Sequence, residues 1–251
     1  MVDIIKRERL NEEFELEHED EAFDEYIHIA SVISVNYFLI ADEISKLGDF
    51  NSGLAIDMGS GLGDLAIAVA KRYPQLNIIG IDISQKAIQE AIHKVKDEDL
   101  ANVKFQIEDA HSLSFPDQSV DLVVSHGTIH HFKNPAKVLS EIYRVLKPNA
   151  VAYLSDLRRD APENIVKEIA ESLSENQARG FINSIKASYV PEELIDTIVN
   201  LGITDFYVSG QSFSRETIIK NKDRLRKSSR RKADYTKLSL TAIIRKESDN
   251  Q

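Results

Sequence analysis

The chain has 251 residues, a formal net charge of −10 at pH 7 and 42% hydrophobic residues, which is typical of a globular protein with a sizeable core. It contains no cysteine, which excludes disulfide bonds, a thiolate nucleophile and a zinc–cysteine site. No apolar run approaches the roughly 18–20 residues that a membrane span needs, and the amino-terminal sequence MVDIIKRERLNEEFELEHEDE lacks the apolar stretch of a secretory signal. We therefore expect a cytoplasmic protein without membrane contact.

The charge is unevenly distributed along the chain. Residues 1–25 hold eleven acidic and three basic side chains, whereas residues 215–232 hold nine basic and two acidic ones. The basic segment could contact nucleic acid or a membrane surface, but it lacks interleaved aromatic side chains for base stacking. We favour pairing with acidic residues 8–25 of the same or a second chain. Nucleic acid is then not an expected partner, and the protein is expected to be a monomer or a homodimer.

The amino-terminal part predicts one long amphipathic helix. Apolar residues recur every three or four positions from Phe23 to Leu47, which is the helical period. Gly48 is expected to cap the carboxyl end of this helix.

Short apolar segments then alternate with helical ones. Strands are predicted at Gly53–Met58, Asn77–Asp82, Val103–Ile107, Val120–Ser125 and Ala150–Ser155, and helices at Asp64–Tyr73, from the N-cap Ser84 to about Lys96, and from the N-cap Asn134 to about Leu146. This alternation predicts a parallel sheet with helices on both faces. Such sheets bind ligands at the carboxyl ends of their strands.

The carboxyl-terminal part predicts further helices and two strands. Residues 160–187 have a helical pattern, with a capping box from Asp160 to Glu163 and a division near Gly180. Pro191 begins a helix that reaches Leu201, and Ile203–Ser209 and Tyr235–Ile244 are predicted strands.

A glycine-rich loop follows the first predicted strand, and it has three interpretations. Residues 57–63 read DMGSGLG and lead into a helix, so the backbone can approach an anionic ligand closely. Residues 61–66 fit the dinucleotide pattern G-x-G-x-x-A, with Asp82 21 residues after Gly61. Asp57, two positions before Gly59, instead fits an S-adenosylmethionine site. A tight turn without a ligand is the third interpretation.

Acidic residues end the second and third predicted strands. The Asp82 carboxylate can accept both hydroxyls of a ribose, or it can serve only as a favourable acid at a helix start. The segment Glu108-Asp109-Ala110 follows the third strand. A carboxylate there can accept the exocyclic amine of adenine, or it can be a solvated loop acid.

The stretch Asp57–Pro148 resembles the class I S-adenosylmethionine-dependent methyltransferases, in their UbiE-like small-molecule branch. The resemblance is carried by AIDMGSGLGDLAIAVA, IIGIDIS, QIEDAHSLSFPDQSVDLVVSHGTIHHFKNP and VLSEIYRVLKPNAVAYLSD. GITDFYVSG and YTKLSLTAIIR resemble the family's sixth strand and antiparallel seventh strand, and the missing cysteines set the chain apart from the arsenic-methylating branch.

The resemblance implies an α/β fold with a Rossmann-like, seven-stranded, mostly parallel sheet, an antiparallel last strand, helices on both faces and a helical lid. Residues 1–251 then form one methyltransferase domain. Its parts are a helical cover (1–50), a cofactor-binding core (51–156), a lid insertion (157–190), and the last helix with strands six and seven (191–251).

The resemblance also implies the cofactor S-adenosylmethionine and its contacts. The methionine end and sulfonium would lie against Asp57, Gly59, Ser60, Gly61 and Gly63. Asp82 would bind the ribose, Ile83 would line the adenine, and Asp109 and Ala110 would meet the adenine edge. Ser125 and His126 would lie under the methionine moiety, and Tyr26 of the amino-terminal helix would contact the cofactor.

Three histidines follow the fourth predicted strand, in the segment SHGTIHHFKNP. A histidine titrates near neutral pH and can take the proton of an O–H or N–H acceptor, so His126 or His130 is the candidate base. His130 and His131 cannot both face a pocket from an extended segment, and no metal site is expected. The alternative is that these histidines only shape the pocket.

Acceptor-binding residues are expected in the cover, after the fourth strand and in the lid: Tyr37, His131, Arg158 and Arg159. The two guanidinium groups could bind a carboxylate or phosphate, or form surface salt bridges with the acid-rich amino-terminal segment. The sequence predicts methyl transfer to an O, N or C nucleophile of a small molecule. An RNA or protein methyltransferase that uses residues 215–232, a non-catalytic S-adenosylmethionine-binding module and, least favoured, an NAD dehydrogenase are the alternatives.

Overall fold

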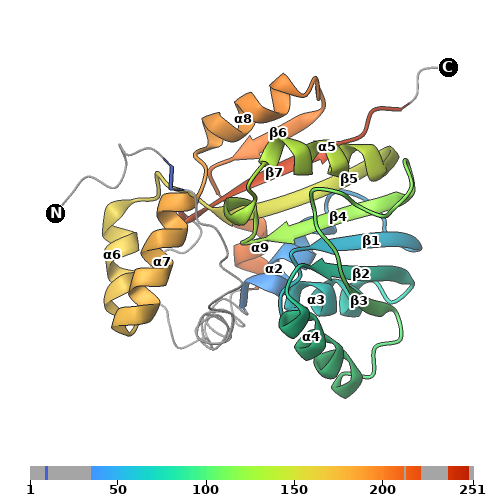
Figure 1. The fold of residues 1–251 in the computed structure, drawn as a ribbon, viewed down its shortest axis with the longest axis horizontal. Coiled ribbons are helices and arrows are strands. Elements are labelled where there is room, and N and C mark those ends of the chain that lie inside the picture. Colours follow the sequence, from blue (N-terminus) through green and yellow to red (C-terminus); the bar gives the residue numbers. More distant parts are fainter. Residues whose placement is uncertain (1–8, 11–34, 212, 222–236, 249–251) are drawn as a thin grey trace.

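The computed structural model describes residues 9–10, 35–211, 213–221 and 237–248 (Figure 1). Its centre is a seven-stranded sheet with the order β3-β2-β1-β4-β5-β7-β6. The strands are β1 (Gly53–Met58), β2 (Leu76–Asp82), β3 (Val103–Ile107), β4 (Val120–His126), β5 (Leu146–Leu157), β6 (Phe206–Ser209) and β7 (Ser239–Arg245). Strands β1 to β5 are parallel, and β7 is antiparallel to its neighbours β5 and β6. The predicted Rossmann-like fold with an antiparallel last strand is confirmed.

Helices cover both faces of the sheet (Figure 1). One face carries α2 (Val35–Ile44), α3 (Asp64–Arg72), α4 (Gln85–Asp97) and the short α9 (Arg215–Lys220), and the other carries α5 (Pro135–Val145) and α8 (Pro191–Asn200). Each face has its own apolar cluster, and these include Ile40 and Val69 on the α2 face and Ile142 and Ile198 on the α5 face. Burial on both sides explains why the central strands are continuous apolar runs.

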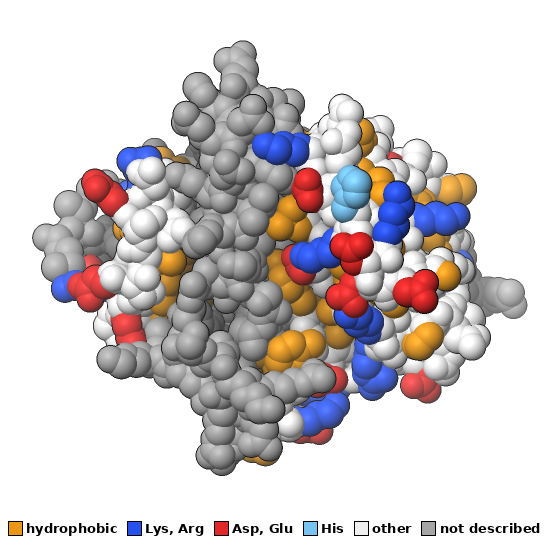
Figure 2. All heavy atoms as spheres, turned by 90° about the horizontal axis from the view of Figure 1, so that it is seen from below, with side chains coloured by type: hydrophobic (Ala, Val, Ile, Leu, Met, Phe, Trp, Pro, Cys, Tyr) orange, Lys and Arg blue, Asp and Glu red, His pale blue; other side chains and the backbone are white. Residues whose placement is uncertain are grey.

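The outer face of α3 and α4 is seen from below in Figure 2, where basic and acidic side chains are interspersed. The ion pairs Lys94–Asp64 and Lys71–Glu98, both with an N–O distance of 2.6 Å, join side chains of this face. No helix among the described residues has the length and hydropathy that crossing a membrane requires.

Residues 157–190, the predicted lid, contain α6 (Glu163–Glu171) and α7 (Glu175–Ala187), which lie beside one end of the sheet, at the left of Figure 1. These helices share a small apolar cluster that includes Ile165 and Ile185. The predicted division near Gly180 is wrong, because Gly180 lies inside α7 and the break precedes Ser174. Ser174 caps α7 by accepting from the Gln177 N–H, while the Gln177 side chain accepts from the Ser174 N–H.

The capping box predicted from Asp160 to Glu163 is also wrong. Pro162 precedes α6 and gives no side-chain cap. The Asp160 carboxylate instead binds the Arg158 guanidinium.

Other boundaries differ from the sequence prediction. α2 ends at Ile44, followed by a turn, so Gly48 is not its cap. β5 begins at Leu146, before the predicted Ala150, and β6 begins at Phe206, after Ile203. The expected helical residues 23–34, with Tyr26, and residues 222–232 of the basic segment lie outside the described residues.

Replacing Ser174 by alanine is expected to lower the free energy of unfolding by about 1 kcal/mol, because α7 loses its capping acceptor. Urea unfolding followed by circular dichroism measures the change. Ser174→Thr keeps a capping hydroxyl and is the matched control. Equal midpoints for wild type and Ser174→Ala would contradict the assigned role of this cap.

Candidate functional site

The glycine loop forms a tight cradle at the carboxyl end of β1. Gly59, Gly61 and Gly63 have φ values of 66°, 48° and 77°, which L side chains rarely adopt. A Cβ at Gly59 would lie 2.1 Å from the Thr128 side chain. The Ser60 N–H donates to the carbonyl of Ile81 at 2.9 Å, which joins the loop to β2. The Ser60 hydroxyl is buried and has no hydrogen-bond partner among the described residues.

Asp57 lies buried beneath this loop, with 1% of its surface exposed. Its Oδ2 accepts the Ala66 N–H at 2.9 Å, in the first turn of α3. Burial raises the pKa of Asp57 to about 8, so its protonated form predominates at pH 7. A positive charge placed beside the carboxyl group would favour the carboxylate form.

Asp82, at the end of β2, holds the glycine loop from the other side. Its Oδ2 accepts the Gly61 N–H at 2.8 Å, and its Oδ1 accepts the Ser84 N–H at 2.9 Å. The Ile83 N–H is a third donor to this carboxylate, whose two oxygens together offer about four acceptor sites. Burial raises the pKa of Asp82. Ile83 follows with 49% of its surface exposed, an open apolar contact beside the carboxylate.

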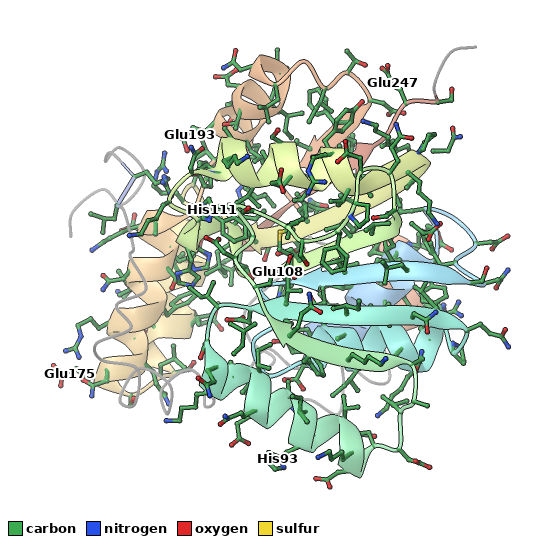
Figure 3. The ribbon with its side chains drawn as sticks, turned by 45° about the vertical axis from the view of Figure 1, so that its right-hand side comes forward. His93, Glu108, His111, Glu175, Glu193 and Glu247 are labelled. Carbon is green, nitrogen blue, oxygen red and sulfur yellow. The ribbon has the colours of Figure 1, made fainter. Side chains whose placement is uncertain are left out.

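The loop after β3 fixes Asp109 through a histidine. Asp109 Oδ1 accepts from the N–H and from Nδ1 of His111 at 2.9 and 2.7 Å, and His111 Nε2 accepts the Asn134 N–H at 3.2 Å. Burial raises the pKa of Asp109, but these His111 contacts outweigh it and hold the pKa below its usual range. Figure 3 shows His111 and Glu108 in this loop. Ala110 is buried, whereas Asp109 is exposed.

The end of β4 carries Ser125 and His126. The Ser125 hydroxyl is fully buried and donates to the Met58 carbonyl at 2.9 Å, so it ties β4 to β1. The His126 ring meets the Tyr37 ring of α2 edge-on, with 5.7 Å between centroids. His126 Nδ1 is buried and has no hydrogen-bond partner within the described part of the chain, and burial lowers the pKa of His126 to about 4.

His130 and His131 lie in the short helix η3 (Ile129–His131), not in an extended segment as predicted. His130 is 4% exposed, and Asp156 accepts both its backbone N–H and its Nδ1, each at 2.8 Å. Since a carboxylate only accepts, Nδ1 carries the hydrogen. The His131 ring lies 4.0 Å from the His130 ring, and burial, followed by the charge of His130, lowers the pKa of His131 to about 3.

Both arginines after β5 are engaged with the protein itself. Arg158 binds the Asp160 carboxylate and donates to the Gly210 carbonyl at 2.7 Å. Arg159, 7% exposed, donates to the Ser188 carbonyl at 2.8 Å and to the Glu193 carboxylate of α8. These contacts fasten both ends of residues 157–190 to their neighbours. The acidic residues 11–25 lie outside the described residues, and an acceptor role of the two arginines stays a prediction.

The structure thus brings together the glycine loop, Asp82 and the ends of β3 and β4. Two contributors were not found from the sequence: Asp156, which fixes His130, and Thr128, whose side chain packs against Gly59. Asp156 directly follows the fifth predicted strand, and this position at a strand end could have marked it as a candidate site residue. Among the described residues, no cluster of three potential metal-ligating side chains is present.

Comparison with known proteins places this site in a family. Residues 51–223 match the family described as “Methyltransferase domain”. The chain belongs to this methyltransferase family. The membership confirms the resemblance seen in the sequence.

Several named methyltransferases match parts of the chain. A demethylmenaquinone methyltransferase from Lactobacillus johnsonii is 40% identical over 106 residues, which cover 41% of this chain and 42% of that protein. The namesake from Porphyromonas gingivalis is 27% identical over 190 residues, or 70% of this chain and 78% of that protein. The chain spans about two fifths of the length of the first curated relatives that it matches.

The fold also matches solved methyltransferase structures. The plantazolicin methyltransferase BpumL, in complex with SAH, has a TM-score of 0.71 at 21% identity, with 92% of this chain and 91% of that chain covered. At this level of identity, the match establishes the shared methyltransferase fold.

Proposed function

We propose that the protein transfers a methyl group from S-adenosylmethionine to an O, N or C nucleophile of a small molecule. The observation that carries this proposal is the glycine loop held by Asp82 at the carboxyl ends of β1 and β2, within a methyltransferase domain. The relatives named for demethylmenaquinone methylation and the BpumL structure with SAH support the same reaction class.

The residues around the loop fit S-adenosylmethionine. The Asp82 carboxylate retains acceptor capacity for the ribose hydroxyls. Exposed Ile83 offers an apolar contact for adenine, and Asp109, which His111 orients, can accept the adenine amine. The buried Ser60 hydroxyl, which has no partner in the part of the chain that the structure describes, and Asp57 lie where the methionine end would bind. Tyr26 remains a predicted contact outside the described residues.

S-adenosylmethionine supplies an activated methyl group on a sulfonium. The protein aligns the acceptor with the methyl group, excludes water from the site and removes the acceptor's proton. The glycine loop places the backbone against the cofactor. The Asp57 carboxyl group is buried, and its ionised form would stabilise the positive sulfonium beside it.

His126 and His130 are the two candidate bases, and the structure distinguishes their environments. Asp156 holds His130 in the tautomer whose Nε2 can accept a proton. His126 is the last residue of β4 and packs against Tyr37, but its lowered pKa makes it a weak base. We propose His130 as the base and His126 as a contact of the acceptor, with Tyr37 and His131 beside them.

Arg158 and Arg159 are better explained as anchors of the lid than as acceptor ligands, given their internal partners. The described part of the basic segment also pairs within the chain, since Lys220 lies 3.2 Å from Asp42 of α2. Neither observation favours an RNA substrate. A cytoplasmic location, a single-domain organisation and a monomeric or dimeric state stay predictions.

Calorimetric titration of the purified protein with S-adenosylmethionine, SAH and NAD tests this proposal. We expect micromolar binding of the first two ligands and none of NAD. Binding of NAD alone would contradict the proposal, as would a correctly folded protein that binds neither adenosyl ligand.

Replacing Asp82 by alanine is expected to weaken S-adenosylmethionine binding by about 1–3 kcal/mol, because two ribose hydroxyls and the Gly61 N–H lose their acceptor. The same calorimetric titration measures this change. Asp64→Ala, in the first turn of α3, is a control that removes a carboxylate paired with Lys94 at the surface. Unchanged affinity in Asp82→Ala would exclude the ribose assignment.

A further inference from the structure

The loop that carries Asp109 depends on the rest of the protein for its shape. Residues 108–119, all of them described, join β3 to β4 without a helix or strand; we call them the β3–β4 loop. At its start, the Glu108 N–H donates to the Asp82 carbonyl at 3.0 Å. The next residue, Asp109, begins a turn in which its carbonyl accepts the Ser112 N–H at 3.0 Å. The place of Asp109 is therefore set by whatever holds this turn.

Helix α5 presents a fixed pair of charged side chains to the loop. Arg144 Nε and Nη2 donate to the two carboxylate oxygens of Glu141 at 3.0 and 2.8 Å. Glu141 is 7% exposed, and its hydrogen bonds with Arg144 hold its pKa below the usual range, so it stays ionised. A two-point contact between a guanidinium and a carboxylate fixes the orientation of both groups. We call Glu141 and Arg144 the α5 pair.

The α5 pair binds the backbone of the β3–β4 loop. Glu141 Oε2 accepts the Leu113 N–H at 2.9 Å, and Arg144 Nη2 donates to the Leu113 carbonyl at 3.0 Å. Arg144 Nη1 donates to the Phe115 carbonyl at 2.9 Å and to the Asp117 carboxylate at 2.7 Å. The Leu113 and Phe115 side chains are buried in the apolar cluster of the α5 face. Both backbone groups of Leu113 are thus bound by one pair of side chains.

The clamped residue adjoins the turn that places Asp109. Leu113 directly follows Ser112, which closes that turn. His111, inside the turn, also contacts α5, because its Nε2 accepts the N–H of Asn134, the N-cap of the helix (Figure 3). Both contacts from His111 go to Oδ1 of Asp109, so Oδ2 is available to a ligand, and the side chain is 61% exposed. Helix α5 therefore supports the turn from its first residue and from its last turn.

We propose that Arg144 and Glu141 are positioning residues that hold Asp109 at the 6-amino group of adenine. They would thereby determine the selectivity of the protein for a cofactor that carries this amine. A hydrogen bond weakens steeply when its distance or angle leaves a narrow range, so a small displacement of the turn would remove it. This inference rests on the proposed function and deepens it, since it assigns selectivity to two residues that do not touch the cofactor.

The test compares two ligands of the full chain by calorimetric titration. One is SAH, and the other is the analogue of SAH in which hydrogen replaces the adenine 6-amino group. The ratio of their dissociation constants, analogue over SAH, is the selectivity ratio. A role in stability alone would not change this ratio, because the two ligands differ only at the amine.

Arg144→Met removes the guanidinium group and keeps an unbranched side chain. Lys147→Met is the matched control. The Lys147 ammonium lies 2.7 Å from the Asp121 carboxylate, which likewise accepts a backbone N–H, that of Leu54, at 2.9 Å. This second pair lies near the amino ends of β1 and β4, at the opposite end of the sheet from the candidate site.

We expect wild type and Lys147→Met to have a selectivity ratio of about ten, which corresponds to about 1.4 kcal/mol and to one hydrogen bond to a charged group. Arg144→Met should lower the ratio to about two or less through weaker binding of SAH, with little change for the analogue. Arg144→Lys keeps the charge but loses the planar fork, so its ratio should lie between these values. It replaces Arg144→Met if circular dichroism shows that the latter does not fold.

A double variant tests whether Arg144 acts through Asp109. Asp109→Ala alone should bring the selectivity ratio to about one, because the amine loses its acceptor. Adding Arg144→Met to Asp109→Ala should not change the ratio further, since two residues that act through one contact are not additive. A further fall of the ratio in the double variant would contradict the proposed route.

Two other results would overturn the inference while SAH binding leaves the proposed function intact. One is an unchanged selectivity ratio in the folded Arg144 variants, which would leave the α5 pair with a role in stability alone. The other is a ratio of about one in wild type, which would exclude the contact between Asp109 and the adenine amine. Failure of folded wild type to bind SAH would overturn the proposed function and this inference together.

Discussion

Replacing Asp156 by alanine is expected to lower the free energy of unfolding by about 3–5 kcal/mol, the range seen when one partner of a buried pair is removed. Asp156 is 2% exposed and accepts three hydrogen bonds, from the N–H and Nδ1 of His130 and from the Leu157 N–H at 2.7 Å. Each donor would be left buried without an acceptor, and each such group is costly. Urea unfolding at pH 7 measures the loss.

The chain offers a matched control in the pair Asp109–His111. It joins the same two groups at 2.7 Å, but the Asp109 side chain is 61% exposed. Asp109→Ala should therefore change stability by only about 0–1 kcal/mol, as for surface pairs. If Asp156→Ala and Asp109→Ala have similar effects, burial is not what makes the His130–Asp156 contact important.

Asp156→Ala should also reduce methyl transfer more than it reduces S-adenosylmethionine binding. Without Asp156 the His130 ring can adopt either tautomer, and the proposed base loses its orientation. A parallel loss of activity and cofactor affinity would show instead that Asp156 acts by supporting the whole site.

Replacing Gly63 by alanine is expected to destabilise the protein by about 2–5 kcal/mol. Gly63 precedes α3 with φ 77°, where an L residue costs about 1–2 kcal/mol. A Cβ there would lie 2.5 Å from the Phe105 ring and 3.1 Å from Ala91. Such overpacking adds about 1–3 kcal/mol.

Gly202→Ala separates these two contributions. Gly202 has φ 73°, close to that of Gly63, but a Cβ there would meet nothing within 4 Å. It should incur only the backbone cost of about 1–2 kcal/mol. Thermal unfolding of both variants measures their losses of stability, and the difference is the packing contribution. Equal losses would show that the Phe105 ring moves aside without an energetic cost.

Local sequence patterns predicted the elements of the core well. The N-caps Ser84 and Asn134 are observed as expected, accepting from the N–H groups of Ala87 and Lys137. These motifs depend on residues within a few positions of each other. The division of the lid was predicted less well, because Gly180 is tolerated inside α7 once neighbouring turns are hydrogen-bonded, while Ser174 and Gln177 form the stronger boundary signal.

The hydrogen-bond partners of several polar side chains could not be predicted from local sequence patterns. No local motif indicates a partner for Arg159, but the fold brings the Ser188 carbonyl and the Glu193 carboxylate into contact with it. Ser125 was expected beneath the cofactor, and its hydroxyl binds the Met58 carbonyl 67 positions away. Such partners are set by strand order and by the packing of the lid, which local patterns do not encode.

The sequence by itself determined the alternation of strands and helices, the glycine loop and the acids at the strand ends, since these depend on hydrophobic periodicity and short-range backbone chemistry. Only the tertiary structure decided which histidine is held by a carboxylate and which buried polar side chains become neighbours. Asp156 and His130 are 26 residues apart, and Ser155 and Thr241 lie on paired strands separated in the chain by α6 to α8, β6 and α9. Their juxtaposition arises from the parallel and antiparallel registers of β4, β5 and β7.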